Sequence, residues 1–516
     1  MRNREDTIAA IATAQGEGGI AIVRVSGPDA LKALEAVFTR QSAEKGLTGV
    51  DALQGEARTA GALEAVFARQ STEKGLSGID ALQGEAHTAG ALEAVFTRQS
   101  AEKGLSGIDA LQGEARTAGW TPNRLYYGHV VEDGRIVDEA MVVYMAAPRS
   151  YTREDVCELH VHGGRYAAEK ALSLILRQRV RAAEPGEFTL RAFLNGRIDL
   201  SQAEAVMAMI SAGSASAARA AARQLEGSLG AFVNEASREL TDMLALIEAN
   251  VDFPEEVDEA ATSRELESGI RRVRARLLAA VDERTARIIR DGLTVAIAGA
   301  PNAGKSSLMN AMLKSDRAIV TSVPGTTRDV LSERLRVGGL DVTLLDTAGI
   351  RETRDEIERE GVARARRAAD AADAVLLVVD GAKPEGDAER ALLEGADERY
   401  IVVLSKCDLG VDAGRAGLRA SAKTGEGIDE ILKEIMKRAG SVDAAEERLT
   451  QPRHIDCAKA AVHALDRAMD ALLEGVPPDL VSVDLMAALS SLHEITGQSA
   501  SDEVIAAVFR NFCVGK

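Results

Sequence analysis

The sequence predicts a multidomain α/β protein with an N-terminal α+β domain, an all-α helical domain split in sequence, and an inserted domain with a mostly parallel sheet. Three observations lead to this prediction. The chain has 516 residues, more than one ordinary domain holds. From residue 293 onward, the apolar runs LTVAIAG, LDVTLLD, AVLLVVD and YIVVLSK alternate with helical stretches, which is typical of parallel strands joined by crossover helices. Helical segments lie on both sides of that region, so the all-α domain is interrupted by it.

An internal repeat occupies much of the N-terminal region. Residues 33–61 (ALEAVFTRQSAEKGLTGVDALQGEARTAG) recur almost unchanged at 62–90 and 91–119. Repeats of roughly 20–50 residues can form a solenoid, but three copies between unrelated flanks argue against one here. Each copy begins with a short helical pattern and ends in a Gly-rich connection. We therefore interpret 62–119 as two extra copies looped out of a smaller domain.

Periodicity predicts the remaining elements. Residues 20–27 and 139–146 have the apolar and β-branched composition of strands. Residues 201–250 are Ala-rich, lack proline and show helical spacing, which predicts two long helices. Residues 262–290 continue as helix, and the chain is helical again beyond 445. The predicted domains are 1–194, then 195–289 for the first helical part, 290–440 for the inserted domain and 441–516 for the second helical part.

The composition limits the class of protein. Hydrophobic residues make up 46% and charged residues 28% of the chain, as in a soluble globular protein. No apolar run is long enough for a membrane span and the N-terminus lacks a signal-peptide core, so we expect a cytoplasmic protein without membrane association. The four cysteines form no CxxC pair, which argues against a zinc site or a disulfide framework. The net charge of −18 argues against a broad basic surface that would bind nucleic acid.

A phosphate-binding motif follows the first strand of the inserted domain. Residues 299–306 (GAPNAGKS) fit GxxxxGK[ST] between an apolar strand and a helix, which is the setting that this motif requires. Its glycines let backbone N–H groups face phosphates, and the helix N-terminus adds partial positive charge. We expect Lys305 to reach the β- and γ-phosphates and Ser306 to bind Mg²⁺.

Two further segments are expected on the phosphate side. The segment 346–349 (DTAG) follows a strand, and its carboxylate, Asp346, suits Mg²⁺ while its last N–H suits the γ-phosphate. Residues 321–329 (TSVPGTTRD) are expected to supply a mobile threonine to the Mg²⁺ shell. The glutamine that usually orients the attacking water after DTAG is missing, since Ile350 and Arg351 stand there. The hydrolytic chemistry must therefore use a group from elsewhere.

Two loops are expected to select the base. Residues 405–408 (SKCD) follow a strand at the position where GTPases carry N/TKxD. Asp408 would accept hydrogen bonds from guanine N1 and N2, which adenine cannot supply, and the stem of Lys406 would pack on the base. Ser405 replaces the usual asparagine and has a shorter reach, so we expect weakened nucleotide affinity. Residues 421–423 (SAK) fit the last guanine-side loop, where a backbone N–H meets O6.

The predicted nucleotide site thus gathers residues from five loops, with Lys305 and Asp346 as catalytic groups. The residues expected to contact GTP are Asn302, Ala303, Gly304, Lys305, Ser306, Ser307, Thr321, Ser322, Val323, Pro324, Gly325, Thr326, Thr327, Asp346, Thr347, Ala348, Gly349, Ser405, Lys406, Asp408, Ser421, Ala422 and Lys423.

These loops and their flanks resemble the tRNA uridine-modification GTPase family known as MnmE or TrmE. Within the inserted domain, the resemblance rests on PNAGKSSLMN, VPGTTRDV and DTAGIRETRDEIEREG. Outside it, DTIAAIAT, GGIAIVRVSG, YTREDVCELHVHGG, PGEFTLRAFLNGRIDLSQAEAV and the terminal FCVGK match. The second set is the more specific, because generic GTPases have nothing like it. The resemblance covers nearly the whole chain except the repeats.

The resemblance implies an N-terminal folate-binding domain that forms a homodimer, a helical domain and an inserted P-loop GTPase domain. It implies a GTP hydrolase that works with an FAD-dependent partner, MnmG or GidA, in a heterotetramer, with FAD on the partner only. Together they would add a carboxymethylaminomethyl-type group at C5 of the wobble uridine of certain tRNAs, using the one-carbon unit of a reduced folate (a tetrahydrofolate derivative). It also implies that K⁺ stimulates hydrolysis by neutralising charge where an arginine finger would stand.

The resemblance also implies individual roles. Glu358, in DEIEREG, would organise the attacking water, although from the sequence alone it is a charged residue on a helix. Cys513, in FCVGK, would be linked to the modification step, with a buried small residue near a domain contact as the alternative. The implied ligands are Asn302, Thr321, Val323 and Thr326 for K⁺, Ser306 and Thr327 for Mg²⁺, and Arg24, Glu158, Arg197 and Lys516 for the reduced folate. Cations suit the glutamyl tail of a folate, and a carboxylate suits its amino-pteridine edge.

The repeats do not belong to the family pattern. They fall in the N-terminal domain, where they could disturb dimerisation or folate binding, but long surface insertions add little closure entropy and we expect them to be tolerated. The alternative function is a GTP-switched ribosome or RNA assembly factor without modification activity. A paralogue that has lost the modification role is a third interpretation. Binding of a reduced folate would separate the first function from the second.

Overall fold

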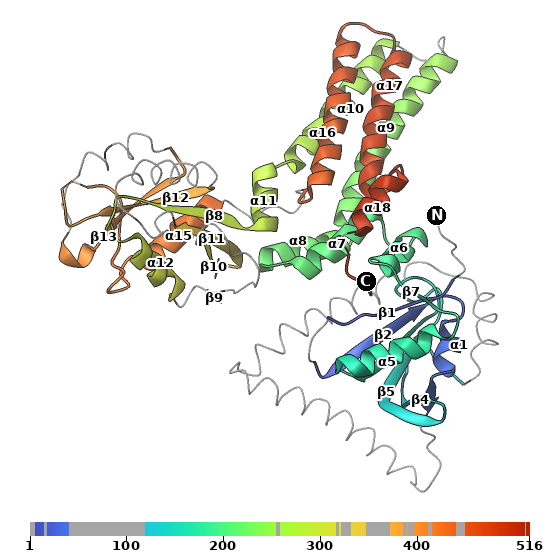
Figure 1. The fold of residues 1–516 in the computed structure, drawn as a ribbon. Coiled ribbons are helices and arrows are strands. Elements are labelled where there is room, and N and C mark those ends of the chain that lie inside the picture. The colour runs from blue at the N-terminus through green and yellow to red at the C-terminus, as the bar shows by residue number, and fades with distance from the viewer. Residues whose placement is uncertain are drawn as a thin grey trace, which may run out of the picture. The chain divides into compact units, whose positions relative to one another are not determined.

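The computed structural model of the chain divides into two compact units, Met1–Ile198 with Glu503–Lys516 and Asp199–Asp502. The residues described are 6–14, 18–40, 119–253, 259–315, 319–320, 332–346, 372–384, 390, 397–410, 415–439, 449–510 and 512–516 (Figure 1). Within these ranges, no helix combines the length and the apolar character that a membrane span needs. The bounds of the four domains expected from the sequence stay predictions.

A mostly antiparallel sheet forms the centre of the first unit, with its strands in the order β3-β4-β5-β6-β2-β1-β7. The strands are β1 (Ile8–Ile11), β2 (Ile20–Ser26), β3 (Phe38–Arg40), β4 (Leu125–Glu132), β5 (Arg135–Met145), β6 (Val156–His162) and β7 (Arg181–Ala182). The β1–β7 pair is parallel. The strands predicted at 20–27 and 139–146 are confirmed as β2 and the second part of β5.

Helices cover one face of this sheet. The covering helices are α1 (Ala30–Glu35) and α5 (Arg165–Leu176). Two further helices, α6 (Glu187–Leu194) and α18 (Asp502–Arg510), follow the last strand of this sheet along the chain. Strands β2 and β6 alternate buried and half-buried side chains, as expected when only one face of a sheet packs on a core. The buried side chains of the two strands form that core with the apolar residues of α1 and α5.

The start of the first repeat copy lies in α1 and in the edge strand β3. The Arg40 guanidinium, at the end of β3, donates a hydrogen bond to the carbonyl of Gly119 at 2.5 Å. It also lies 3.6 Å from the ring centre of Trp120 and 4.1 Å from that of Tyr126. The chain therefore leaves β3 and returns before β4 at neighbouring points, as an insertion would. The rest of the predicted repeat, 41–118, lies outside the described residues.

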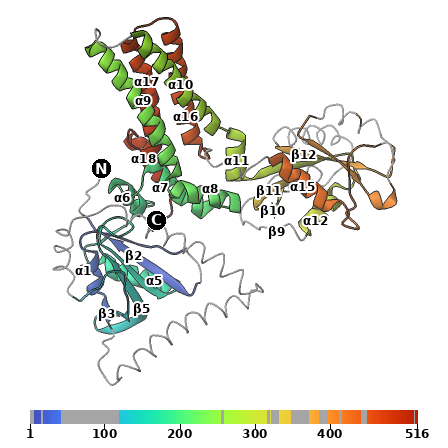
Figure 2. The same ribbon diagram turned by 180° about the vertical axis from the view of Figure 1, so that it is seen from behind.

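The second unit contains a helical bundle built from two separate parts of the chain (Figures 1 and 2). The helices of the first part are α7 (Leu200–Ser211), α8 (Ala215–Leu225), α9 (Ser228–Asp252), α10 (Glu259–Ala280) and α11 (Glu283–Asp291), and those of the second are α16 (Pro452–Leu473) and α17 (Pro478–Thr496). Helices α9, α10, α16 and α17 share one hydrophobic core, in which Leu240, Ile270, Leu465 and Leu485 are fully buried. The bundle thus joins sequence segments that flank the inserted domain, as predicted.

The prediction of two long helices over 201–250 is wrong, because three helices cover this range. The break after α7 lies at Gly213 and Ser214, where the Ser214 side chain accepts a hydrogen bond from the Ala217 N–H and caps α8. The next break lies at Gly227, whose φ of 93° ends one helix before α9 begins. The helix expected over 262–290 is also interrupted, since the Asp282 side chain caps α11.

A buried ion cluster ties the two parts of the bundle together. Glu204 of α7 forms an ion pair with Arg453 of α16 at 2.7 Å and contacts the buried His454 at 2.5 Å. Burial raises the pKa of Glu204, but the hydrogen bonds from Arg453 and His454 outweigh burial and lower this pKa to about 2. The carboxylate is therefore held ionised between helices that lie about 250 positions apart in sequence.

The inserted region forms a second sheet in the order β14-β13-β12-β8-β11-β10-β9. Its strands are β8 (Leu293–Ala298), β9 (Ile319–Val320), β10 (Ser332–Val337), β11 (Leu340–Asp346), β12 (Ala374–Asp380), β13 (Tyr400–Ser405) and β14 (Leu418–Arg419), and its helices α12 (Lys305–Leu313) and α15 (Ile428–Ala439). The four apolar runs predicted as parallel strands are β8, β11, β12 and β13, and they pair in parallel. The carboxyl ends of these strands, and the loops that follow them, lie along one edge of the sheet.

Candidate functional site

The loop between β8 and α12 curls as the phosphate-binding motif requires. Gly299 has a φ of 147° and Gly304 a φ of 97°, while Asn302 adopts a left-handed φ of 62°. A side chain at Gly299 would collide with the carbonyl oxygen of Val378 in β12, so only glycine fits there. Lys305 begins α12 and is buried, and its ammonium donates to the carbonyls of Gly299 at 2.9 Å and Ala300 at 3.0 Å.

The loop predicted to select the base, called the base-selecting loop below, follows β13, which is separated from β8 by β12. Asp408 lies in a short 3-10 helix (Cys407–Leu409), and its carboxylate accepts a hydrogen bond from the hydroxyl of Ser421 at 2.8 Å. Ser421 is fully buried, and its hydroxyl also accepts from the Lys423 N–H at 3.3 Å. The two loops predicted to contact guanine thus lie side by side in the described structure.

Ser405 links these two loops to the phosphate loop. Its buried hydroxyl lies 2.5 Å from the carbonyl oxygen of Ala303 and 2.9 Å from that of Val379. A serine hydroxyl has one proton to donate, so it satisfies one of these carbonyls at a time. Serine therefore makes a contact to the phosphate loop from the position where asparagine is usual, and the weakened affinity expected from this substitution stays a prediction.

The described residues cover only part of the predicted phosphate side. Asp346 is the last residue of β11 and pairs in register with Ile297 at the end of β8, beside the phosphate loop. Ser306 lies in the first turn of α12. The predicted residues that lie outside the described ranges are Thr321, Ser322, Val323, Pro324, Gly325, Thr326, Thr327, Thr347, Ala348, Gly349 and Glu358.

Sequence reasoning missed Asp380, which ends β12 and contacts the base-selecting loop. Its carboxylate accepts a hydrogen bond from the Lys406 ammonium at 2.7 Å. Burial raises the pKa of Asp380, but the hydrogen bonds from Lys406 and the Ala382 N–H, together with the charges of Lys406 and Lys383, outweigh burial and lower this pKa. The signal was present, since a carboxylate at the end of a parallel strand is the same feature that pointed to Asp346.

A second cluster lies in the first unit and unites the four predicted folate residues. Arg24 of β2 and Glu158 of β6 face each other in register, and the Arg24 Nε donates to the Glu158 carboxylate at 2.8 Å. Arg24 also donates to the Gly515 carbonyl at 3.3 Å, which brings the C-terminal Lys516 to the cluster. The Arg24 and Arg197 guanidinium groups lie 5.6 and 4.8 Å from the centre of the Tyr151 ring.

Burial and neighbouring charges shift the pKa values of the groups in this cluster. Burial raises the pKa of Glu158, but the nearby His160, whose Nε2 lies 3.5 Å from the carboxylate, and the ion pair with Arg24 lower it to about 2. Burial lowers the pKa of Lys516, and the nearby Arg24 lowers it further. Burial also lowers the pKa of Arg197. One carboxylate therefore stands among three partly desolvated cations, an arrangement that can bind a ligand with both anionic groups and amine donors.

Cys513 is exposed in the C-terminal segment of this unit. The alternative expectation, a buried small residue, is therefore wrong. Its carbonyl accepts a hydrogen bond from the N–H of Gly186 at 3.3 Å, which fixes the terminal segment against the start of α6. The thiol stays available to solvent next to the cluster residue Lys516.

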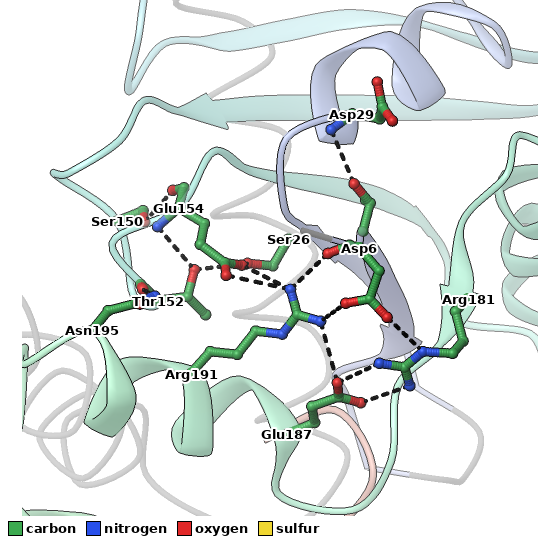
Figure 3. Close-up of polar contacts among 11 residues, drawn as sticks. Asp6, Ser26, Asp29, Ser150, Thr152, Glu154, Arg181, Glu187, Arg191 and Asn195 are labelled. Atoms are coloured by element: carbon green, nitrogen blue, oxygen red, sulfur yellow. Dashed lines mark hydrogen bonds and ion pairs between the residues drawn. The ribbon is translucent and has the colours of Figure 1, made fainter. Parts of the chain in front are cut away.

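A network of charged residues supports this cluster from α6 (Figure 3). The buried guanidinium of Arg191 donates to the backbone carbonyl of Asp6 at 2.8 Å and to its carboxylate at 2.5 Å. It also reaches Glu187 at 3.2 Å and both carboxylate oxygens of Glu154 at 3.3 Å. Arg181 contacts Asp6 and Glu187 from the other side.

The same network holds the loop that carries Tyr151 (Figure 3). Ser26 donates to the carboxylate of Glu154 at 2.7 Å, and its hydroxyl lies 2.7 Å from that of Thr152. Asn195, at the end of α6, donates to the Thr152 carbonyl at 2.7 Å. Thr152, which follows Tyr151 in sequence, is therefore held at both its hydroxyl and its carbonyl. This holds the loop that carries the Tyr151 ring, next to which Arg24 and Arg197 lie.

Comparison with known proteins gives full-length matches. Residues 200–513 match the family model of the MnmE helical domain, and residues 7–74 and 77–197 match that of the GTP-binding protein TrmE N-terminus. The tRNA modification GTPase MnmE of Roseiflexus sp. (strain RS-1) is 40% identical over 537 residues, which covers 99% of each chain. The protein of the same name from Lactococcus lactis subsp. lactis (strain IL1403) is 38% identical, over 99% of this chain and 98% of its own. Among solved structures, the G domain of the T. maritima FeoB iron transporter is 28% identical over 28% of this chain and 98% of its own, with a TM-score of 0.22.

Proposed function

The chain belongs to the MnmE family of tRNA modification GTPases, and from this premise we propose that it acts with an FAD-dependent partner of the MnmG type on the wobble uridine of certain tRNAs. It is a GTP hydrolase of tRNA modification that binds its nucleotide with Mg²⁺. The proposed product carries a carboxymethylaminomethyl-type group at C5. The proposed assembly is a heterotetramer of a homodimer of this chain with the partner, and FAD stays on the partner.

The observation that carries the proposal is the cluster in which Glu158 and Lys516 lie beside Arg24, while Arg24 and Arg197 lie beside the Tyr151 ring. A reduced folate presents an amino-pteridine edge with N–H donors and a tail with carboxylates. The ionised Glu158 carboxylate suits the N–H donors of the pteridine edge, while the cationic side chains of the cluster suit the carboxylates of the folate tail. The Tyr151 ring offers an aromatic surface to a flat heterocycle. When bound, the folate would supply the one-carbon unit, and the residues of this chain would orient it.

For the nucleotide, the described residues support separate roles. The curled loop at 299–304 and the N-terminus of α12 present N–H groups and positive charge to phosphates. Asp408 selects guanine, and its orientation is fixed by Ser421. The proposed ligands of K⁺ and the proposed role of Glu358 in organising water rest on the family motifs, since of these residues only Asn302 is described.

The test combines folate binding with analysis of tRNA. The purified variant Glu158→Gln should lose binding of 5-formyltetrahydrofolate, a stable reduced folate, in calorimetric titration, because the amide repels ring donors that a carboxylate accepts. It should retain GTP hydrolysis. The matched control is Glu169→Gln, an exposed glutamate of the same unit that pairs with Arg165 on α5.

In cells, mass spectrometry of wobble uridines should show the modification after deletion of the chromosomal copy and complementation with the wild type or the control. The modification should be absent when the deletion strain is complemented with Glu158→Gln. Unchanged wobble uridines in the deletion strain would remove the proposed role. GTP hydrolysis without folate binding would then favour the alternative, a GTP-switched assembly factor.

A further inference from the structure

The strand β12 lies between the strands that carry the two nucleotide loops. The order β13-β12-β8 places the end of β12 beside both the phosphate loop and the base-selecting loop. Its last residue, Asp380, pairs in register with Ser405, the first residue of the base-selecting segment. No motif of the sequence assigns a role to Asp380, yet it lies at the end of the strand between the two loops and contacts Lys406, which bridges them.

Asp380 holds the side chain of Lys406 in a defined place. The Lys406 ammonium donates to the Asp380 carboxylate at 2.7 Å and to the Asn302 carbonyl, in the phosphate loop, at 2.9 Å. The lysine backbone is left-handed, with a φ of 60°, which directs the side chain across the gap between the two loops. The hydrogen bonds to Asp380 and to the Asn302 carbonyl thus hold the ammonium end of the Lys406 side chain, and the backbone conformation sets the direction in which the side chain starts.

The Asp380 carboxylate is itself held by its surroundings. Its other oxygen accepts a hydrogen bond from the Ala382 N–H at 3.2 Å. Arg415 donates to the carbonyl of Asp380 at 3.1 Å and to that of Lys383 at 2.9 Å, which holds the turn after β12. The Asp380 side chain is only 13% exposed, so solvent competes weakly for its carboxylate, while the Lys406 side chain is 35% exposed.

We propose that Asp380 is a positioning residue of the nucleotide site, which sets the Lys406 stem across the two loops before the guanine base arrives. A lysine side chain is flexible, and ordering it during binding reduces affinity. Asp380 removes most of that cost in advance, because its charge-assisted bond fixes the ammonium. Since Lys406 contacts the base side and not the γ-phosphate, Asp380 serves GDP and GTP alike. The inference concerns nucleotide binding alone and does not depend on the tRNA step.

The experiment measures affinities of the full chain for fluorescent mant-GDP and mant-GTP. Asp380→Asn keeps the size of the side chain and removes its charge. We expect both dissociation constants to rise about tenfold, which is about 1.4 kcal/mol, and the KM for GTP to rise in parallel while kcat at saturation changes little. The preference for mant-GTP over mant-ATP should persist, because Asp408 still selects the base. Asp380→Glu should restore part of the affinity.

A double-mutant cycle separates positioning from a structural role. In a Lys406→Ala background, Asp380→Asn should have no further effect on affinity, because the residue acts through the lysine. The control is Asp397→Asn, which removes a carboxylate that pairs with Arg399 before the start of β13. Equal affinity losses from Asp380→Asn with and without Lys406 would overturn the proposal, as would an unchanged affinity. A loss of preference for guanine would also overturn it, because Asp380 would then contact the base itself.

Discussion

The Arg191 network allows a stability prediction with a defined magnitude. Arg191→Met keeps the aliphatic volume of the side chain but removes a guanidinium that is only 8% exposed and that contacts Asp6, Glu154 and Glu187. Breaking a buried pair by removing one partner costs about 3–5 kcal/mol, because the remaining charges stay desolvated. Asp6 and Glu187 keep Arg181 as a partner, so we expect the lower end, about 3 kcal/mol of unfolding free energy.

The assay is urea denaturation of the full chain at fixed protein concentration, followed by tryptophan fluorescence. The chain contains one tryptophan, Trp120, which is buried in the core of the same unit as Arg191. Its emission therefore reports the unfolding of this unit and not of the helical bundle. We expect the midpoint for Arg191→Met to fall well below that of the wild type, with a similar m value.

The matched control for this prediction is Arg177→Met. Arg177 pairs with Glu132 in the same unit, but its side chain is 58% exposed and Glu132 keeps Lys170 as a second partner. Exposed pairs of this kind contribute little, so the midpoint should hardly move. If both variants shift the midpoint by the same amount, the buried network is not a stabilising feature of this unit and the reasoning is refuted.

Two further predictions concern the second unit. Gly299→Ala should reduce mant-GTP binding by more than about tenfold in the same titration, because the added Cβ meets the Val378 carbonyl and the φ of 147° disfavours alanine; binding at wild-type affinity would contradict this. Glu204 has a folded pKa of about 2 against an ordinary value of 4.5, so its stabilisation of about 3 kcal/mol is present above pH 4.5 and is lost as the pH falls to 2. Glu204→Gln should therefore be less stable than the wild type at pH 7, and the difference should shrink to about 1 kcal/mol at pH 2.5 in far-ultraviolet circular dichroism melts. Parallel pH profiles would disprove the link.

The sequence was sufficient for the parallel sheet and the phosphate loop. Four continuous apolar runs and a Gly-rich motif between a strand and a helix are strong local signals, and β8, β11, β12 and β13 appear where these signals lie. The helix breaks at Gly213 and Gly227 are weak signals in the sequence, because the surrounding alanines favour helix strongly and a single glycine within such a run does not by itself end it. Capping serines and glycines, considered together, would have indicated them.

The cluster for which we propose folate binding could not be predicted from spacing. Arg24 and Glu158 lie 134 positions apart and meet only because β2 pairs with β6. Their expected role rests on the resemblance to a family, and the structure adds Tyr151 and His160, two residues of the segment 151–164 for which the sequence predicts no role. Asp380 is the opposite case, since its position at a strand end was visible in the sequence and only its contact with Lys406 needed the structure.

The contact between Arg40 and Gly119 has a consequence for how this gene can change. Each repeat copy ends in glycine, so removal of 62–119 would place Gly61 directly before Trp120 and restore the same Gly-Trp junction next to the edge strand. Gain or loss of one whole 29-residue unit leaves every other codon in the same reading frame. The number of units can therefore differ between isolates, while the residues that meet at Arg40 stay the same.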